Sequence, residues 1–138
     1  QEKLNRPRPK VIESLNLAAY INAAIDVSDG LLADLSHILS ASQVAGLVDV
    51  NAIPISRAYR WCNQFTHSYD LALCGGDDYE LCFTVAKSNE EKLLAEAEKM
   101  ALRCTRIGEI TTGRGLTFMD GQKEYSVQQK AYDHFQEL

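Results

Sequence analysis

The pattern of hydrophobic and polar positions predicts helices and strands in alternation along the chain. Helical spacing predicts a first helix over residues 11–23, carried by Val11, Leu15, Ala18, Ala19 and Asn22. A short strand or turn is expected before Asp26. A second apolar stripe begins directly after Gly30 and predicts an amphipathic helix, through Leu31, Leu35, Ile38 and Ser42 with Leu32 and Leu39 beside them. His37 falls outside this stripe, so we expect it to be solvated or locally bonded.

The second half of the chain gives stronger strand signals. Residues 79–85 alternate between apolar and polar and predict the clearest strand, with one face in the core. Weaker patterns predict strands at 46–50 and 104–110 and a short helical stretch after Pro54. Ser88 and Glu91 have the spacing of a capping box, before a helix whose apolar face is Leu93, Leu94, Ala97 and Met100. Asp120-Gly121, between two apolar segments, predicts a hairpin.

This order of elements predicts an α+β fold, with the strands grouped on one mixed β-sheet and the helices packed against it. At 138 residues the chain suits a single domain, and 46% hydrophobic with 24% charged residues is ordinary globular composition.

Charge and hydropathy exclude some classes of function. A net charge of -5 and an isoelectric point near 5.1 argue against a nucleic-acid-binding surface. No apolar run approaches the roughly 20 residues of a membrane span, and no signal peptide is visible. We therefore expect no membrane partner and a cytoplasmic location. The four cysteines lack Cys-x-x-Cys spacing, which favours buried, reduced thiols over a zinc site.

The amino terminus resembles a linker between domains. Lys3, Arg6, Arg8 and Lys10 alternate with Pro7 and Pro9, a composition typical of an extended segment. The chain also begins at Gln1 without an initiator Met. We therefore expect residues 1–10 to be the remnant of an interdomain linker and residues 11–138 to be the carboxy-terminal domain of a longer protein.

The segment from Asp26 to Leu31 carries the most specific chemistry. It places Asp26, Ser28 and Asp29 around a tight turn that opens a helix, and no Lys or Arg occurs from Val11 through Ser56. One interpretation is purely structural, with a single side chain here capping the helix. The alternative is a magnesium site that carries a phosphate, because hard oxygen ligands favour magnesium or calcium, and carboxylates alone would repel the phosphate. Asp34, one turn further on, either joins this group or lies on the solvated surface.

Two further segments are candidates for ligand contact. Gly75-Gly76-Asp77-Asp78 is either a flexible turn or a loop whose glycines admit a ligand while Asp77 accepts its hydrogen bonds. Glu80 either contributes or lies at the surface. Tyr132, close to Phe135, either docks the end of the chain or stacks on a flat ligand.

Taken together, these segments resemble the thiamine-monophosphate kinase family in its carboxy-terminal domain, within the aminoimidazole ribonucleotide synthetase-like superfamily. The resemblance runs from about Arg6 to Phe135, and the segments that carry it are Arg6–Pro9, Asp26–Leu31 with Asp34-Leu35, Gly75–Thr84, Ile107-Gly108 and Tyr132–Phe135. It implies transfer of the ATP γ-phosphoryl group to thiamine monophosphate, giving thiamine diphosphate. It further implies that an absent amino-terminal domain supplies the rest of the site and the homodimer interface.

By position in the motifs, the resemblance assigns Mg²⁺ to Asp26 and Asp29, ATP contact to Ser28, and thiamine contact to Asp77 and Tyr132. No residue acts as a general base, since the attacking phosphate oxygen is already ionised. The family usually has Glu where this chain has Asp77. The shorter side chain loses roughly 1.3 Å of reach, which favours a water-mediated contact.

Two other hypotheses remain open. One is a different ATP-dependent member of the superfamily, resembling aminoimidazole ribonucleotide synthetase or selenophosphate synthetase. The other is a noncatalytic cation-binding module. The isolated chain is expected to have little kinase activity, because half of the implied site is absent.

Overall fold

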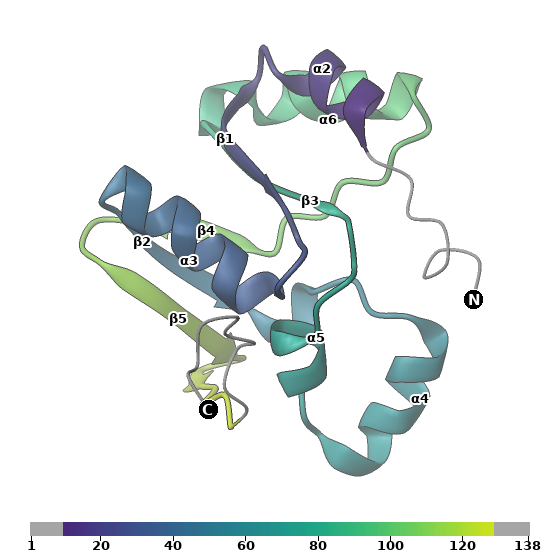
Figure 1. Cartoon of the computed structure of the whole chain (residues 1–138), viewed down its shortest axis with the longest axis vertical. Helices are drawn as coiled ribbons and strands as arrows, with labels where there is room; N and C mark the ends of the chain where they lie inside the picture. Colours follow the sequence, from purple (N-terminus) through teal and green to yellow (C-terminus); the bar gives the residue numbers. More distant parts are fainter. Residues whose placement is uncertain (1–9, 129–138) are drawn as a thin grey trace, which may run out of the picture.

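The computed structural model describes residues 10–128, which form helices packed against two β-sheets (Figure 1). The elements, in chain order, are α2 (Val11–Leu17), β1 (Ile21–Asp26), α3 (Leu31–Ser42), β2 (Ala45–Asp49), the 3₁₀ turn η1 (Val50–Ala52), α4 (Arg57–Thr66), α5 (Asp70–Cys74), β3 (Leu81–Val85), the 3₁₀ turn η2 (Lys87–Asn89), α6 (Glu90–Lys99), β4 (Gly108–Thr111), β5 (Gly115–Asp120) and β6 (Lys123–Glu124). The predicted α+β class is confirmed. The single sheet was wrong, because the strands in residues 10–128 divide between two sheets.

The smaller sheet consists of β1 and β3, paired antiparallel, with Asp26 opposite Leu81 at one end. Both faces of this two-stranded sheet are covered. Cys82 packs toward one group of buried residues, whereas Phe83 and Val85 pack toward another. Because successive side chains of a strand point to opposite faces, β3 contributes to two cores at once, and all five of its residues are half-buried.

The larger sheet is mixed, with strand order β4-β2-β5-β6. β2 runs parallel to β5 and antiparallel to β4. Gly46 of β2 faces α3, where an added Cβ would lie 2.8 Å from Leu39 Cδ1, so the missing side chain lets the helix approach the sheet closely. The predicted hairpin is confirmed, although its turn begins at Gly121 (φ 61°) and Asp120 ends β5.

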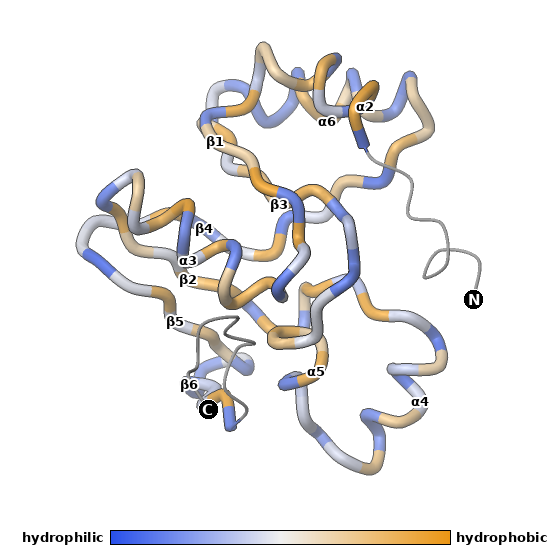
Figure 2. Tube along the Cα trace, in the orientation of Figure 1, coloured by the Kyte–Doolittle hydropathy of each residue, from blue (hydrophilic) through white to orange (hydrophobic). Residues whose placement is uncertain are grey.

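Two groups of buried apolar residues hold these layers together. We call the larger one the central cluster; it lies around α3, α5, β2 and β5 and comprises Val27, Leu31, Leu35, Leu39, Val48, Val50, Ile53, Leu73, Cys74 and Phe118. The second, which we call the upper cluster, comprises Leu17, Leu93 and Ala97, with partly buried neighbours from β1 and β3. Figure 2 shows hydrophobic stretches along β2, β3 and α5 in the interior.

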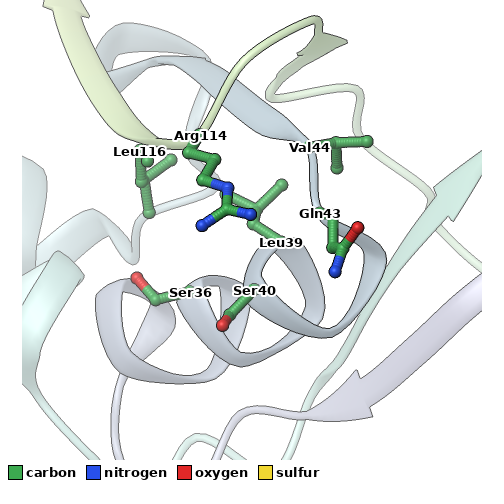
Figure 3. A pocket seen from close by; sticks show the side chains of 8 residues that line it. Ser36, Leu39, Ser40, Gln43, Val44, Arg114 and Leu116 are labelled. Carbon is green, nitrogen blue, oxygen red and sulfur yellow. The ribbon is translucent and has the colours of Figure 1, made fainter.

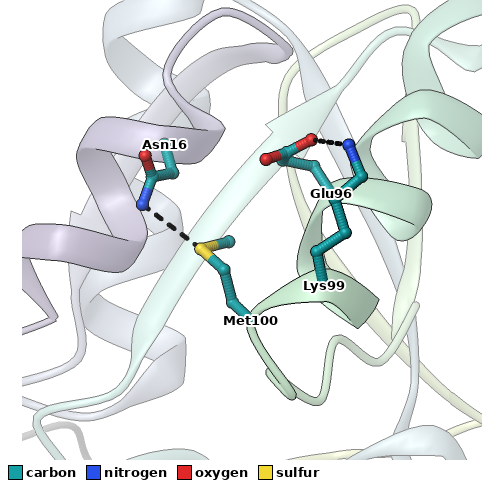
Figure 4. Close-up of polar contacts among 4 residues, drawn as sticks. All are labelled: Asn16, Glu96, Lys99 and Met100. Atoms are coloured by element: carbon teal, nitrogen blue, oxygen red, sulfur yellow. Dashed lines mark hydrogen bonds and ion pairs between the residues drawn. The ribbon is translucent and has the colours of Figure 1, made fainter.

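Helices α2 and α6 lie side by side above the two-stranded sheet (Figure 1). A polar contact joins them at their edge, where Asn16 Nδ2 donates to Met100 Sδ at 3.3 Å (Figure 4). Lys99 and Glu96 pair within α6 at 2.7 Å, on the exposed side. The buried contact between the two helices is therefore apolar, with Leu17 fully buried against Leu93 and Ala97.

The predicted first helix was too long. It ends at Leu17, and the segment from Ile21 is β1 rather than helix. The side chains of β1 alternate in burial, with Ile21, Ala23 and Ile25 less exposed than their neighbours. Pairing with β3 supplies the hydrogen-bond partners that the backbone of this segment would find within a helix. Ala18, Ala19 and Asn22 fit a helical spacing, but the pairing of β1 with β3 outweighs this local preference.

Helix α3 is confirmed as a continuous amphipathic helix, with His37 exposed as expected. The helix predicted after Pro54 is also confirmed as α4. The capping box was wrong, because Ser88 lies inside the 3₁₀ turn η2 and Asn89 occupies the N-cap position of α6 without a side-chain bond. The strand expected from Cys104 begins only at Gly108. Leu94 faces outward on α6 and is 47% exposed.

Helix α4 stands away from both sheets at one end of the molecule (Figure 1). None of its residues is buried, although its Trp61 and Phe65 rings contact each other edge to face at 5.4 Å. Across the described residues, every helix is too short or too polar to cross a lipid bilayer.

We expect Leu73→Ala to lower the free energy of unfolding by about 2–5 kcal/mol, because Leu73 is fully buried in the central cluster and its loss leaves a cavity. Leu71→Ala on the same helix is the matched control, since Leu71 is 64% exposed and should change stability by less than about 1 kcal/mol. Urea unfolding followed by circular dichroism measures both variants. Equal losses would contradict the assigned core.

Candidate functional site

The turn from Asp26 to Gly30 joins the end of β1 to the start of α3. Gly30 is the N-cap of α3, with φ 111°, and α3 has no side-chain cap. An added Cβ at Gly30 would lie 2.9 Å from the carbonyl carbon of Cys74, so this position needs glycine for its backbone angle and for its packing. Neither Ser28 nor Asp29 caps the helix, which excludes helix capping as the role of these two side chains.

Asp34 stabilises the turn from its buried side. Its side chain is only 3% exposed, and Oδ2 accepts hydrogen bonds from the backbone N–H groups of Ser28 at 3.0 Å and Asp29 at 3.1 Å. Of the two alternatives left open by the sequence, Asp34 therefore joins the acidic segment and is not on the surface. Burying a carboxylate is unfavourable unless it is hydrogen-bonded, and these two donors stabilise it.

Cys82 of β3 lies close enough to Asp34 for the two to interact electrostatically. Burial and, to a smaller extent, the charge of Asp34 together raise the pKa of the Cys82 thiol to about 11. The thiol therefore stays protonated near neutral pH. It acts as a small apolar group beneath the turn rather than as a nucleophile.

The loop from Gly75 to Glu80 lies directly against this turn. Three backbone hydrogen bonds join the two segments, from Val27 N to Glu80 O at 2.8 Å, from Tyr79 N to Val27 O at 2.9 Å and from Asp77 N to Ser28 O at 2.9 Å. An added Cβ at Gly76 would lie 2.5 Å from Ser28 O, so glycine is required for this close approach. We refer to these three bonds as the loop-turn ladder.

The loop-turn ladder brings Asp77 next to the predicted metal-binding turn. Tyr79 Oη donates to Asp77 Oδ1 at 2.9 Å. This hydrogen bond to Asp77 and the charge of Asp77 raise the pKa of Tyr79, and the charges of Asp26 and Asp29 add to the shift. One hydroxyl is therefore bonded to the carboxylate predicted for the substrate and is influenced by the charges of the two carboxylates predicted for the metal.

The donors in this region suit Mg²⁺ held jointly with a phosphate. Asp26 is exposed at the end of β1, Asp29 is half-buried, and Ser28 Oγ lies 3.4 Å from Asp29 Oδ1. No group of three acidic, histidine or cysteine side chains within residues 10–128 is arranged to hold a metal ion by itself. Magnesium commonly takes one or two protein carboxylates and completes its shell with water and substrate phosphates, so two aspartates fit it.

The remaining predicted residues fall into two groups. Glu80 is exposed and lies 3.7 Å from Lys10 Nζ, which pairs it with a cation from the start of α2. Asp78 is exposed on the same loop. Tyr132 lies outside the described residues, as does nearly all of the linker predicted for residues 1–10.

A pocket in the described part of the chain lies elsewhere. It measures about 500 Å³ and is lined by α3 and the start of β5, with Arg114 reaching over Leu39 and with Ser36 and Ser40 on the helix (Figure 3). The candidate site is instead an open surface between two backbone segments. Such a surface is suited to be completed by bound phosphates and a further protein surface.

Asp70 is a second buried carboxylate that sequence reasoning missed. It is 6% exposed, and it accepts hydrogen bonds from Tyr125 Oη at 2.7 Å and from the backbone N–H of Gln128 at 3.0 Å. Tyr125 Oη in turn accepts from Tyr69 N at 2.8 Å. Asp70 thus joins the start of α5, which leads into the Gly75–Glu80 loop, to the last residues that the structure describes.

Comparison with known proteins identifies one family model that matches the chain. It is the C-terminal domain of AIR synthase related proteins, and it matches residues 1–121. This match covers β1, the turn with Asp26 and Asp29, and the loop with Asp77.

Several individual relatives are thiamine-monophosphate kinases. One, from Buchnera aphidicola subsp. Schizaphis graminum, is 39% identical over 94% of this chain and 41% of its own length. A crystal structure of thiamine-monophosphate kinase from Stenotrophomonas maltophilia K279a superposes with a TM-score of 0.78 at 49% identity, covering 85% of this chain and 37% of that one. The structure of AaThiL complexed with AMPPCP and TMP superposes with a TM-score of 0.75 at 30% identity, covering 97% and 40%. The chain therefore spans about two fifths of the length of these relatives.

We expect Asp34→Ala to expose the backbone N–H groups of Ser28 and Asp29 to hydrogen exchange and to lower the free energy of unfolding by about 1–3 kcal/mol, because two partly buried donors lose their acceptor. Exchange measured by NMR at these two amides tests the assignment. Asp34→Asn keeps a carbonyl acceptor and should lose less, and His37→Ala, on the exposed side of the same helix, should lose almost nothing. Unchanged exchange at both amides in Asp34→Ala would contradict the role of Asp34.

Proposed function

The chain belongs to the family of AIR synthase related proteins, whose C-terminal domain it carries, and on this premise we propose that it forms part of an ATP-dependent thiamine-monophosphate kinase. The reaction would transfer the γ-phosphoryl group of ATP to thiamine monophosphate and give thiamine diphosphate. The observation that carries the proposal is the loop-turn ladder, which holds the Asp26–Asp29 turn beside Asp77. A relative that superposes over 97% of this chain is in complex with AMPPCP and TMP.

The charges of the site support a reaction between two phosphates. Asp26, Asp29, Asp34 and Asp77 are all acidic, and the stretches from Val11 to Ser56 and from Trp61 to Ala86 hold no Lys or Arg. A phosphate would be repelled by these carboxylates unless a divalent cation lay between them. We propose that Asp26 and Asp29 hold Mg²⁺. When bound, the ion would supply neutralisation of the phosphate charge and orientation for in-line transfer.

The protein's own residues then have binding and orienting roles. Ser28, half-buried in the turn, is proposed to contact ATP. Asp77 is proposed to contact the thiamine moiety, directly or through water, and Tyr132 to stack on it. None of them needs to act as a general base, because the attacking phosphate oxygen is already ionised at neutral pH. The protein's contribution is therefore to bring the two anions together in a fixed orientation.

We propose that residues 11–138 act as the carboxy-terminal domain of this kinase and that an amino-terminal domain completes the ATP site and the homodimer interface. The open form of the site and the share of the relatives' length that the chain spans support this. The four cysteines, all within the described residues, form no disulfide with one another, which suits a reducing compartment such as the cytoplasm.

We expect the chain coexpressed with the upstream domain that this proposal requires to convert thiamine monophosphate to thiamine diphosphate in the presence of ATP and Mg²⁺. The 138-residue chain alone should show little or no turnover, because half of the site would be absent. Chromatographic detection of thiamine diphosphate measures both. Robust turnover by the 138-residue chain alone would contradict the proposed division of the site, and no turnover by the coexpressed protein would contradict the proposed function.

The magnesium assignment has its own test in the same coexpressed protein. We expect the double substitution Asp26→Asn with Asp29→Asn to weaken Mg²⁺-dependent ATP binding at least about tenfold, because even changes next to metal ligands commonly cost that much. Isothermal titration measures the affinity with and without Mg²⁺. The matched control is Glu91→Gln with Glu98→Gln, which removes two exposed charges from α6. Equal affinity in both double variants would exclude Asp26 and Asp29 as the metal ligands.

A further inference from the structure

The loop that carries Asp77 is held in an unusual backbone conformation. Asp77 and Tyr79 both have positive φ, at 66° and 50°, although neither is glycine. Left-handed conformations are unfavourable for such residues by roughly 1–2 kcal/mol each and persist only where the surroundings impose them. The surroundings here are the backbone carbonyls of Ser28 and Val27, which accept from the N–H groups of Asp77 and Tyr79.

This conformation brings the side chains of Asp77 and Tyr79 together. Tyr79 Oη donates to Asp77 Oδ1 at 2.9 Å, and the Tyr79 residue is 36% exposed. An exposed aspartate otherwise samples several rotamers, so this bond to a ring with few torsions restricts the carboxylate. Within the described residues Asp77 Oδ2 accepts no hydrogen bond, so this oxygen is available to a ligand.

The same hydroxyl also relates Asp77 to the turn. The charges of Asp26 and Asp29 reach Tyr79 strongly enough to raise its pKa, after the larger effect of Asp77 itself. Tyr79 thus bonds to the carboxylate of the loop and interacts electrostatically with the two carboxylates of the turn. The loop-turn ladder sets the backbone separation, and the hydroxyl of Tyr79 sets where the Asp77 carboxylate lies within it.

We propose that Tyr79 is a positioning residue, whose hydroxyl fixes Asp77 so that its other carboxylate oxygen meets the thiamine moiety of the acceptor at a constant separation from the Asp26–Asp29 turn. The inference rests on the proposed function, because it concerns how the acceptor is held. Tyr79 acts through Asp77 and does not itself touch the reacting phosphates. Its loss should therefore affect the acceptor and leave ATP binding unchanged.

The test is Tyr79→Phe in the coexpressed protein, a change that removes one oxygen and keeps the ring. We expect the KM for thiamine monophosphate to rise about tenfold, as for loss of one hydrogen bond to a charged group, while the KM for ATP changes less than about twofold. Tyr20→Phe is the matched control, because Tyr20 is a half-buried tyrosine in the upper cluster, away from the turn and the loop, and should leave both constants unchanged.

A double-mutant cycle shows whether Tyr79 acts through Asp77. Asp77→Gly removes the side chain and tolerates the positive φ. In that background Tyr79→Phe should add less than about twofold to the KM for thiamine monophosphate. The positioning role is overturned if Tyr79→Phe still raises the KM tenfold in the Asp77→Gly background. It is also overturned if the wild-type protein is active and Tyr79→Phe alone leaves the KM for thiamine monophosphate unchanged. A wild-type protein that does not phosphorylate thiamine monophosphate overturns the proposed function itself.

Discussion

The antiparallel pairing of β1 with β3 is the interaction on which the rest of the structure depends. It places Asp26 opposite Leu81, so that segments far apart in the sequence leave the sheet at the same end. The pairing also continues past the strands as the loop-turn ladder. Because both faces of the sheet are covered, one by the central cluster and the other by the upper cluster, the site is an extension of a buried element. The exposed loops therefore need no core of their own to hold their geometry.

Electrostatics then distinguishes this turn from an ordinary helix entry. Asp34 is buried beneath the turn, and its charge is stabilised by the two backbone donors of Ser28 and Asp29. Those donors would otherwise point toward a bound anion, in the manner of a helix N-terminus. The turn therefore gives up two anion-binding groups and gains a negative charge. That arrangement favours a phosphate that arrives with a cation and disfavours a bare phosphate.

Local patterns predicted the elements whose identity depends on their own residues. The apolar stripe of α3 and the alternation of β3 each extend over enough residues to indicate one kind of structure. The hairpin at Gly121 follows from the Asp120-Gly121 turn residues. The start of β1 was missed because Ile21, Ala23 and Ile25 are decided by pairing with a strand about 60 residues away. The division into two sheets was missed for the same reason, since pairing partners are not visible in one segment.

The residues of the candidate site divide in the same way, into those that local sequence predicts and those that only the fold brings into place. Asp26, Ser28, Asp29 and Asp77 were found from residue type and spacing, and the structure brings the two segments together. Asp34, Tyr79 and Asp70 act through burial or through contacts across the fold, which composition does not encode. Asp34 left one signal, an acidic residue on the buried side of α3. The loop-turn ladder itself consists of peptide groups, which every residue except proline supplies equally. As long as Gly76 permits the close approach, the distance between the two halves of the site is therefore set by these peptide groups. Substitutions of the carboxylate side chains can then alter which ligand is bound while the frame that holds it stays the same.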